Sequence, residues 1–588
     1  MNEEIEKLLD TLPDTVKTNI KNYLEGTHDQ DAKDFVIKNL KTNPSSLIDA
    51  FFQKLTFGTG GARGIMGIGT NRLNKYTIQT MAQGLANYIK KQSSFKTQTV
   101  LIGYDNRNNS QFFAQETANV LSANNIQVLL FKNLRPTPLV SFGCRYKKCI
   151  AAIMITASHN PPEYNGFKVF WEDGGQVIPP HDTGIIQEVN NINSLEDVKT
   201  EANNDLIQII DDEIDLAYLS RIKHLENYDN YSKENIKIVY TNLHGTGLTI
   251  LPEALKQWGF NDLLIVEKQK AFDGNFTNAP SPNPENPHTL QLGISDMITK
   301  QADILIATDP DADRIAVAVN HNNKPVILTG NQTSCILLDY ILKVNTAHQT
   351  LTSKDAAIKS IVTTEMFRSI AKEYKIQCFD VLTGFKYIAE KINSWEKEDS
   401  YNFIFGAEES CGYLATTAVR DKDSISTACI IAEIVALAKQ ENKTLVDILY
   451  EIYQKHGVYR EKLHNINLKA DKNSLDKIQE IMTKLRTANL TKIGNYSIKK
   501  IEDYEKRESY DLETQETKPL DFPRSNVLSF WFEDNSKLVI RPSGTEPKIK
   551  IYAGCFEQNI DDMQETIRKC DSRNTALIEE LETEMLND

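Results

Sequence analysis

A serine and a histidine stand side by side directly after a short apolar run in the first third of the chain. Residues 151–155, Ala-Ala-Ile-Met-Ile, are typical of a buried strand, and the run ends at small and polar residues followed by Pro161 and Pro162. Ligands bind at the carboxyl ends of strands in α/β sheets, so Ser158 and His159 stand where a nucleophile and its helper would be placed. A turn with a capping serine is the simpler explanation when the pair is taken alone.

Three aspartates at alternate positions follow a second apolar strand. Asp309, Asp311 and Asp313 point their carboxylates toward one place if the backbone is extended, which suits a hard cation such as Mg²⁺. An EF-hand loop begins in the same way, but here Arg314 stands where its turn glycine belongs and Asn320 where its bidentate glutamate belongs. A phosphoaspartate phosphatase site, which also uses Asp-x-Asp after a strand, and a solvated acidic turn remain as alternatives.

Two loops combine cations with glycine, as anion sites do. The run 57–64, Phe-Gly-Thr-Gly-Gly-Ala-Arg-Gly, can let backbone amides converge on an anion beside Arg63, or it can be a flexible hinge. The second loop lies between two predicted strands near the end of the chain and on chemical grounds is a phosphate cradle, each charged hydrogen bond contributing about 1.5–3 kcal/mol. Its residues are Arg541, Ser543, Gly544 and Thr545.

A group suited to sugar hydroxyls follows the predicted strand 401–405. Glu408 and Ser410 lie in a stretch bounded by glycines, where they can accept hydrogen bonds from vicinal hydroxyls and donate back to them. Upstream, Lys386 places another cation on a glycine turn. By itself this group is compatible with many polar ligands.

Composition limits the kinds of partner. The chain has 588 residues, which is too long for one core and predicts roughly three to five domains. Its formal charge is 66 − 80 = −14, so it repels polyanions and we expect no nucleic-acid partner, although a small anion remains possible where cations gather. The eight cysteines lack paired metal-ligand spacing and are typical of reduced thiols.

The chain carries no pattern that directs it to a membrane. Its first residues are acidic, without the apolar run of a signal peptide, and the most apolar helical stretch, 425–438, contains Glu433 and is too short to span a bilayer. We therefore expect a cytoplasmic protein.

The elements that must position these residues fall into four blocks. The first fifty residues have a helical pattern with one apolar face, formed by Leu8, Leu9, Leu12 and Val16. Strands and helix-length segments then alternate, which predicts α/β domains with parallel or mixed sheets. The rhythm restarts after an acidic, Asn-rich stretch and again near residue 326, and the last block reads as antiparallel strands. We predict domains at 1–205, 206–325, 326–457 and 458–588.

Together these loops resemble the motifs of the α-D-phosphohexomutase family, and the resemblance runs over nearly the whole chain. Residues 156–161 with 164–168 are similar to its phosphoserine motif, and residues 309–314 to its metal loop. Residues 408–410 are similar to its sugar-specificity loop and residues 541–545 to its phosphate-binding loop. Four motifs in the family's order are highly specific. The length and the Glu-Glu-Ser form are most like the phosphoglucomutase branch, which includes phosphopentomutases.

The resemblance implies a fold and an activity. The fold is α/β, with four domains around a central cleft: three α/β domains with mixed sheets and a smaller, mobile α+β C-terminal domain. The implied reaction interconverts α-D-glucose 1-phosphate and glucose 6-phosphate through glucose 1,6-bisphosphate. Phosphopentose and phosphomannose isomerisation are alternatives in the same family. Outside it, the alternatives are a metal-dependent sugar phosphatase and a non-catalytic sugar-phosphate binding protein.

The resemblance also implies a role for each candidate residue. Ser158 carries a phosphoryl group, with His159 beside it, and joins Asp309, Asp311 and Asp313 as a ligand of Mg²⁺. Arg63 and Arg314 steady the transferring group, and Lys168 serves as acid or base with a pKa lowered by neighbouring cations. Glu408, Ser410 and Lys386 bind the sugar, and the loop 541–545 holds the other phosphate. We expect small sugar phosphates as partners, no membrane, and a monomer or homodimer.

The chain departs from the family pattern at two positions. Many members have glycine where this chain has Ala312, in the metal loop, and Ala407, directly before the sugar loop. Neither substitution removes a ligand.

Overall fold

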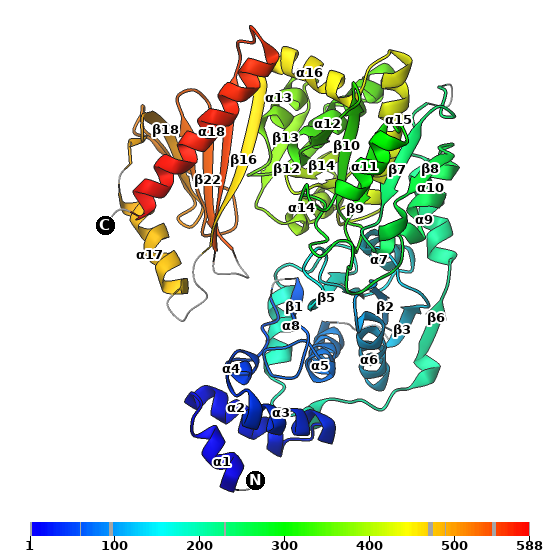
Figure 1. Ribbon diagram of the computed structural model, residues 1–588, viewed down its shortest axis with the longest axis vertical. Coiled ribbons are helices and arrows are strands. Elements are labelled where there is room, and N and C mark those ends of the chain that lie inside the picture. Colours follow the sequence, from blue (N-terminus) through cyan, green and yellow to red (C-terminus); the bar gives the residue numbers. More distant parts are fainter. Residues whose placement is uncertain are drawn as a thin grey trace. The chain divides into compact units, whose positions relative to one another are not determined.

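The computed structural model describes most of the chain (Figure 1), namely residues 3–58, 60–92, 98–228, 231–467, 474–488, 490–543 and 548–586. It divides into two compact units. The first unit comprises Met1–Thr329, Ile388–Phe403 and Ser410–Asn442, and the second comprises Gly330–Tyr387, Ile404–Glu409 and Lys443–Asp588.

Four helices open the first unit, as the apolar pattern predicts. They are α1 (Glu3–Leu9), α2 (Asp14–Glu25), α3 (Gln30–Thr42) and α4 (Ser45–Phe51). Their apolar faces meet in a core of their own, in which Val16, Ile20 and Val36 are buried. Amphipathic helices of this length owe most of their stability to such packing rather than to intrinsic propensity.

A six-stranded mixed sheet carries the serine segment. Its strand order is β1-β5-β4-β2-β3-β6 among the described residues. The strands are β1 (Gly61–Ile65), β2 (Thr99–Tyr104), β3 (Gln127–Phe131), β4 (Ala151–Ile155), β5 (Tyr164–Trp171) and β6 (Ile207–Ile210). Strands β2, β3, β4 and β6 run parallel, whereas β5 is antiparallel to both β4 and β1. The helices of this domain are α5 (Lys75–Gln92), α6 (Ser110–Ala123), α7 (Thr137–Tyr146) and α8 (His181–Asn190).

The central strand β4 is fully buried, as its apolar run predicts. Ile153 and Ile155 have no exposed surface, and burying each such side chain contributes about 1.5–3 kcal/mol. Since both faces of the strand are covered, its first polar residues lie where the chain leaves the sheet.

A second mixed sheet of the first unit carries the aspartates. Its order is β11-β10-β9-β7-β8, with β7 parallel to β8 and β9 and with β10 antiparallel to β9 and β11. The strands are β7 (Lys237–Thr241), β8 (Asp262–Ile265), β9 (Ile304–Thr308), β10 (Ile315–His321) and β11 (Lys324–Leu328). The helices of this part are α9 (Glu213–Lys223), α10 (Leu251–Gln257), α11 (Gln291–Thr299) and α15 (Ser424–Gln440).

The second unit begins with another α/β domain. Strands β13 (Gln377–Val381), β12 (Asp355–Ser360) and β14 (Asn402–Glu408) lie in that order in its sheet, and β12 is parallel to β13. The helices of this part are α12 (Gly330–Ala347), α13 (Glu365–Glu373) and α16 (Leu445–His456), whereas most of α14 (Phe385–Glu398) belongs to the first unit.

An antiparallel sheet forms the C-terminal domain, in the order β16-β23-β22-β21-β18-β19-β20 with β17 beside β18. The strands are β16 (Val458–Asn467), β17 (Lys492–Ile493), β18 (Tyr496–Asp503), β19 (Glu508–Asp511), β20 (Thr517–Pro519), β21 (Leu528–Phe532), β22 (Lys537–Pro542) and β23 (Lys548–Glu557). Helix α18 (Met563–Leu586) packs on β16 and β23 and crosses in front of the sheet in Figure 1; α17 is Ser474–Thr487. The fold class is thereby confirmed: three α/β domains and a C-terminal domain with an antiparallel sheet. The arrangement around a cleft, the domain bounds and the mobility of the last domain stay predictions.

The cysteines are free thiols, as their scattered spacing predicts, and almost all of them are buried. Only Cys378 is partly exposed. Burial raises the pKa of the buried Cys144, Cys335 and Cys429 thiols, which keeps them protonated and unreactive near pH 7.

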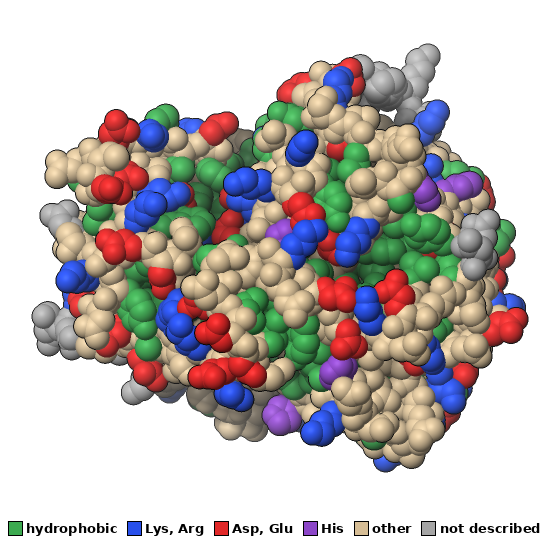
Figure 2. Space-filling view, turned by 90° about the horizontal axis from the view of Figure 1, so that it is seen from above, with side chains coloured by type: hydrophobic (Ala, Val, Ile, Leu, Met, Phe, Trp, Pro, Cys, Tyr) green, Lys and Arg blue, Asp and Glu red, His purple; other side chains and the backbone are tan. Residues whose placement is uncertain are grey.

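The described residues show mixed surface charge (Figure 2) and no helix suited to a membrane. Figure 2 shows acidic and basic side chains interspersed on the face viewed, so the charge of −14 is not concentrated in one area there. In the described part of the chain, every helix is too short or too polar to cross a membrane.

A cluster of charges around the buried Lys359 joins the two domains of the second unit. Lys359 on β12 is fully buried, and its Nζ lies 3.0 Å from a carboxylate oxygen of Glu365 and 3.0 Å from one of Asp380. Arg368 pairs with the same two carboxylates, and Lys537 on β22 lies 3.4 Å from Glu365. Lys359 and Lys537 have little access to water, so their charges depend on these partly buried carboxylates.

We expect the Lys359→Met substitution to lower the free energy of unfolding of the second unit by about 3 kcal/mol, because the partly buried Glu365 and Asp380 lose their one fully buried cation partner. Urea denaturation, with hydrogen exchange of peptides covering β12, measures the loss. The matched control is Lys455→Met, whose half-exposed side chain pairs with Glu373 and should change stability by less than about 1 kcal/mol. Equal effects of the two substitutions would contradict the expectation.

Candidate active site

The serine loop, residues 156–163, joins β4 to β5 and holds Ser158 in an unusual backbone conformation. Its φ is +54°, in the left-handed region that residues other than glycine rarely adopt. The backbone N–H donates to Thr156 Oγ1 at 2.8 Å, and the side chain is buried. Left-handed geometry costs an L-residue about 1–2 kcal/mol, so the loop must be held by its surroundings.

The hydroxyl of Ser158 contacts two groups that can accept its proton, a carboxylate and an imidazole. It donates a hydrogen bond to Asp309 Oδ2 at 2.9 Å, and it lies 3.3 Å from Nδ1 of His159. Burial, together with the nearby Arg314 guanidinium, lowers the pKa of His159 well below its usual range, so the imidazole is neutral near pH 7. Ser158 and His159, which are neighbours in the sequence, thus also have side chains in contact.

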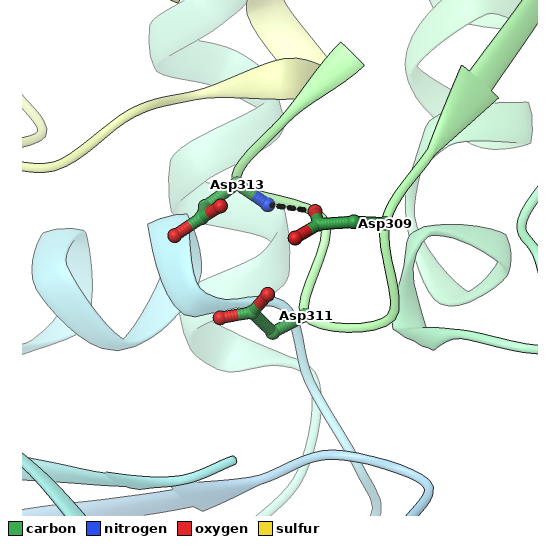
Figure 3. A group of neighbouring side chains, drawn as sticks. All are labelled: Asp309, Asp311 and Asp313. Atoms are coloured by element: carbon green, nitrogen blue, oxygen red, sulfur yellow. Dashed lines mark hydrogen bonds between the residues drawn. The ribbon is translucent and has the colours of Figure 1, made fainter. Parts of the chain in front are cut away.

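The three aspartates form one cluster in the loop between β9 and β10. Figure 3 shows their carboxylates gathered on one side of this loop, and one oxygen from each lies within 4.8 Å of the others. All three are buried. The backbone N–H groups of Asp313 and Arg314 donate to Asp309 Oδ1 and so fix the shape of the loop.

This cluster suits a hard divalent cation. Oδ1 of Asp311 and Oδ1 of Asp313 are buried and have no hydrogen-bond partner among the described residues. Burial and the two neighbouring carboxylates raise the pKa of Asp309, which shows how unfavourable three negative charges are here without a cation. Oxygen ligands of this kind, in excess of negative charge, match the preferences of Mg²⁺ and Ca²⁺.

Lys168 lies beside the aspartates, with a pKa shift opposite to the one expected from the sequence. Strand register places it opposite Met154 of β4 and Gly61 of β1, and its Nζ lies 2.7 Å from Asp311 Oδ2 and 3.4 Å from Asp313 Oδ2. Although burial lowers it, these carboxylates raise the pKa of Lys168 overall. The expected lowering by cations is therefore wrong, because the nearest charges are negative.

The glycine run brings β1 close to β5. Gly61 has a φ of +133°, and a Cβ there would lie 1.9 Å from the carbonyl oxygen of Phe167. Only glycine permits this approach, which explains the run better than a flexible hinge does. Two residues further along β1, the exposed Arg63 donates to Asn160 Oδ1 at 2.7 Å, so it reaches the serine loop. Arg314 donates to Glu285.

The sugar-loop candidates are divided between the two units. In the second unit, Glu408 ends β14 and accepts a hydrogen bond from the Gly384 N–H at 2.8 Å, two residues before Lys386. The Lys386 ammonium lies 5.1 Å from the Tyr387 ring centroid. Ser410 is partly buried and begins a segment of the first unit, which continues into β15 (Gly412–Leu414).

The phosphate-loop candidates lie at the end of β22, in the second unit. Arg541 is partly buried, and its Nε has no hydrogen-bond partner among the described residues. The N–H of Ser543 donates to Lys548 O at 2.8 Å, which joins the end of β22 to the start of β23. Gly544 and Thr545 lie outside the described residues.

Sequence reasoning missed three residues of the site. Thr137 donates through Oγ1 to Asp311 Oδ2 at 2.8 Å, and Lys422 Nζ lies 3.1 Å from Asp313 Oδ2. The third is Arg107, which binds the serine loop. Arg107 follows the strand β2, so the strand-end argument used for Ser158 could have found it. The sequence around Thr137 and Lys422 carries no comparable signal.

Models of one protein family match the chain in three consecutive segments. Phosphoglucomutase/phosphomannomutase α/β/α domain I matches residues 54–196, domain II matches residues 217–323 and domain III matches residues 329–456.

Individual relatives align over nearly the full length. A phosphoglucomutase of Staphylococcus haemolyticus is 35% identical over 520 residues, which are 88% of this chain and 93% of the relative. A phosphoglucomutase of Staphylococcus aureus is 37% identical over 545 residues, which are 91% of this chain and 96% of the relative. Among solved structures, parafusin, a phosphoglucomutase from Paramecium in its open form, is 18% identical with a TM-score of 0.66, covering 90% of this chain and 95% of its own. This last likeness shows a shared fold.

Proposed function

Because the chain belongs to the phosphoglucomutase/phosphomannomutase family, whose members are α-D-phosphohexomutases, we propose that it interconverts α-D-glucose 1-phosphate and glucose 6-phosphate. Ser158 carries the phosphoryl group, and glucose 1,6-bisphosphate is the intermediate. The observation that carries the proposal is the 2.9 Å hydrogen bond from Ser158 Oγ to Asp309, which joins the serine loop to the aspartate cluster. The names of the curated relatives favour glucose over mannose or pentose phosphates.

We assign Mg²⁺ to Asp309, Asp311, Asp313 and the phosphorylated Ser158. When bound, the ion neutralises charge that develops on the transferring phosphoryl group. Arg63 and Arg314 lie close enough to perturb the titration of His159, so their charges also act on that group. Ser158 itself is buried, which limits competing attack by water.

Two groups move the protons. When Ser158 Oγ attacks a sugar bisphosphate, its proton passes to the neutral His159 imidazole while a bond forms from Oγ to phosphorus. The departing sugar oxygen takes a proton from Lys168, whose raised pKa keeps the ammonium protonated at neutral pH. When a sugar hydroxyl attacks phosphorylated Ser158, the protons travel in the opposite directions. Glu408, Ser410 and Lys386 bind the sugar hydroxyls.

One experiment tests the activity and its alternatives. The protein with Mg²⁺ and a trace of glucose 1,6-bisphosphate is incubated separately with glucose, mannose and ribose 1-phosphates, and ³¹P NMR follows each mixture. We expect the fastest isomerisation with glucose 1-phosphate. Release of inorganic phosphate in place of isomerisation would identify a phosphatase, and the absence of any reaction would favour a binding protein.

We expect Arg541→Ala to raise the KM for glucose 1-phosphate on the order of 10- to 100-fold, which corresponds to about 1.4–2.8 kcal/mol of binding. The reason is that Nε of Arg541, which has no hydrogen-bond partner in the part of the chain that the structure describes, stands at the loop proposed to hold the phosphate that does not react. Steady-state kinetics measure the change. Phosphorylation of Ser158 should persist, because the serine and metal loops are untouched.

The control for this substitution is Arg507→Ala in the same domain. Arg507 is half-exposed, and its guanidinium lies 3.9 Å from Asp521. It should leave KM unchanged, whereas wild-type KM and kcat in Arg541→Ala would refute the phosphate-cradle assignment.

Further proposals concern organisation. We propose domains at 1–205, 206–325, 326–457 and 458–588, which contribute the phosphoserine, metal, sugar and phosphate loops in that order. We also propose that the protein acts in the cytoplasm as a monomer or homodimer, on small sugar phosphates rather than nucleic acids or membranes.

A further inference from the structure

Arg107 is a buried cation that the proposed chemistry does not use. It follows β2, and its side chain and that of its partner Asp105 have no exposed surface. The two are joined by an ion pair of 3.3 Å, and Asp105 Oδ1 also accepts the Arg107 backbone N–H at 2.9 Å. The guanidinium stacks 4.9 Å from the ring centroid of Phe276. The ion pair and the aromatic contact fix the direction in which the guanidinium points.

The two terminal nitrogens of this guanidinium are directed at the backbone around the serine loop, whereas Nε faces Asp105. One nitrogen donates to the carbonyls of Ser158, at 2.6 Å, and Asn160. The other donates to the carbonyls of Pro161, at 2.8 Å, and Tyr164, at 2.9 Å. Arg107 therefore binds four carbonyls within seven residues of chain, and the first of them belongs to Ser158.

The serine loop depends on such hydrogen bonds because of its irregular backbone. Residues 156–163 form no strand or helix, so their buried carbonyls lack the partners that regular structure supplies. Ser158 adds a left-handed φ of +54°, which persists only where the surroundings determine the backbone on both sides. On one side the Ser158 N–H is bound to Thr156, and on the other its carbonyl is bound to Arg107.

We infer that Arg107 is a positioning residue, which holds the serine loop so that Ser158 Oγ points at Asp309. The inference rests on the proposed role of Ser158 as phosphoryl carrier. It assigns Arg107 an effect on the rate of phosphoryl transfer and little effect on substrate affinity, because Arg107 itself lies beneath the loop and is closed to solvent.

The test compares Arg107→Ala and Arg107→Lys with the wild type, using glucose 1,6-bisphosphate as the phosphoryl donor. Arg107→Ala should lower kcat about 100-fold, because displacing a reacting atom such as Ser158 Oγ by about 1 Å can have that effect. The KM for the bisphosphate should stay within about threefold of the wild-type value. Arg107→Lys keeps the charge but not the planar fork of donors, so kcat should fall about 10-fold. Millimolar guanidinium ion should restore part of the rate of Arg107→Ala.

A matched control separates positioning from the general loss of a buried ion pair. Arg135 binds Asp215 at 2.8 Å in the same unit, with both side chains nearly as buried. Arg135→Ala should lower thermal stability but retain kcat. A kcat loss in Arg135→Ala as large as that in Arg107→Ala would overturn the positioning role.

Phosphoryl labelling of Ser158, followed by peptide mass spectrometry, distinguishes the two levels of the proposal. If the wild type takes no label, the proposed function fails. If the wild type is labelled and Arg107→Lys is labelled at the same rate with wild-type kcat, only the positioning role is overturned. Loss of the wild-type circular dichroism spectrum in both Arg107 variants would also overturn it, because Arg107 would then serve the fold as a whole.

Discussion

Ser158→Ala is expected to reduce mutase activity on the order of 10⁴- to 10⁶-fold, the range seen when an enzyme loses its nucleophile. No other described hydroxyl group donates to the aspartate that Ser158 binds. The fold should survive, because the substitution removes one buried hydrogen bond worth about 0.5–1.5 kcal/mol and alanine meets the same backbone strain as serine. A coupled assay for glucose 6-phosphate, with mass spectrometry of the peptide that contains residue 158, measures both effects.

The control for this substitution is Ser122→Ala in α6, outside the site. The Ser122 hydroxyl is also buried and donates to Asn119 O at 3.0 Å. The Ser122→Ala variant should lose a similar amount of stability and keep wild-type mutase activity. Substantial turnover by Ser158→Ala, or a phosphoryl label on another residue of the wild type, would show that Ser158 is not the carrier.

Asp311→Asn is expected to lower kcat on the order of 10²- to 10³-fold at a fixed Mg²⁺ concentration, with partial recovery when Mg²⁺ is raised. The change keeps the shape of the side chain but removes one of three buried negative charges. It also weakens the contact with Lys168, because the carboxylate that pairs with the ammonium at 2.7 Å becomes a neutral amide. Activity measured across a Mg²⁺ titration gives the shift in metal dependence.

The corresponding control is Asp355→Asn, a buried carboxylate in β12 that accepts hydrogen bonds from Thr352. It should leave the Mg²⁺ titration unchanged. Full wild-type activity in excess chelator would exclude the assignment of a metal to the aspartate cluster.

The site shows which parts of such a protein can be predicted from sequence. Ser158 and Asp309 were found because each follows a buried apolar run, a local pattern that needs no knowledge of the rest of the fold. That two loops 151 residues apart meet in one hydrogen bond is not a local property. It followed only from the resemblance to a family in which both motifs occur.

The errors and omissions have a common physical origin. The pKa shift of Lys168 was predicted in the wrong direction because nearby cations were expected, whereas its nearest charges are Asp311 and Asp313. Thr137 and Lys422 were missed because only their contacts with those carboxylates distinguish them. Charge partners depend on tertiary packing, which periodicity does not encode.

The fold was predicted best where apolar residues are dense. The helical pattern of the first fifty residues and the strands β21, β22 and β23 follow directly from it. Strands β19 and β20 carry mostly polar or exposed side chains, so nothing in their sequence separates them from loops. Strand β19 forms because β18 offers it a paired edge, and β20 pairs in turn with β19.

The reaction of the buried thiols with an added reagent can report local unfolding of the protein. Three of the four proposed domains contain buried cysteines, among them Cys144 in the first and Cys555 and Cys570 in the last. A thiol reagent added to the native protein reacts only with molecules in which the covering segment has swung away. The labelling rates of Cys144 and Cys570, measured separately with and without sugar phosphate, would give the rates at which the first and last domains open locally. No residue of the chain has to be changed for this measurement.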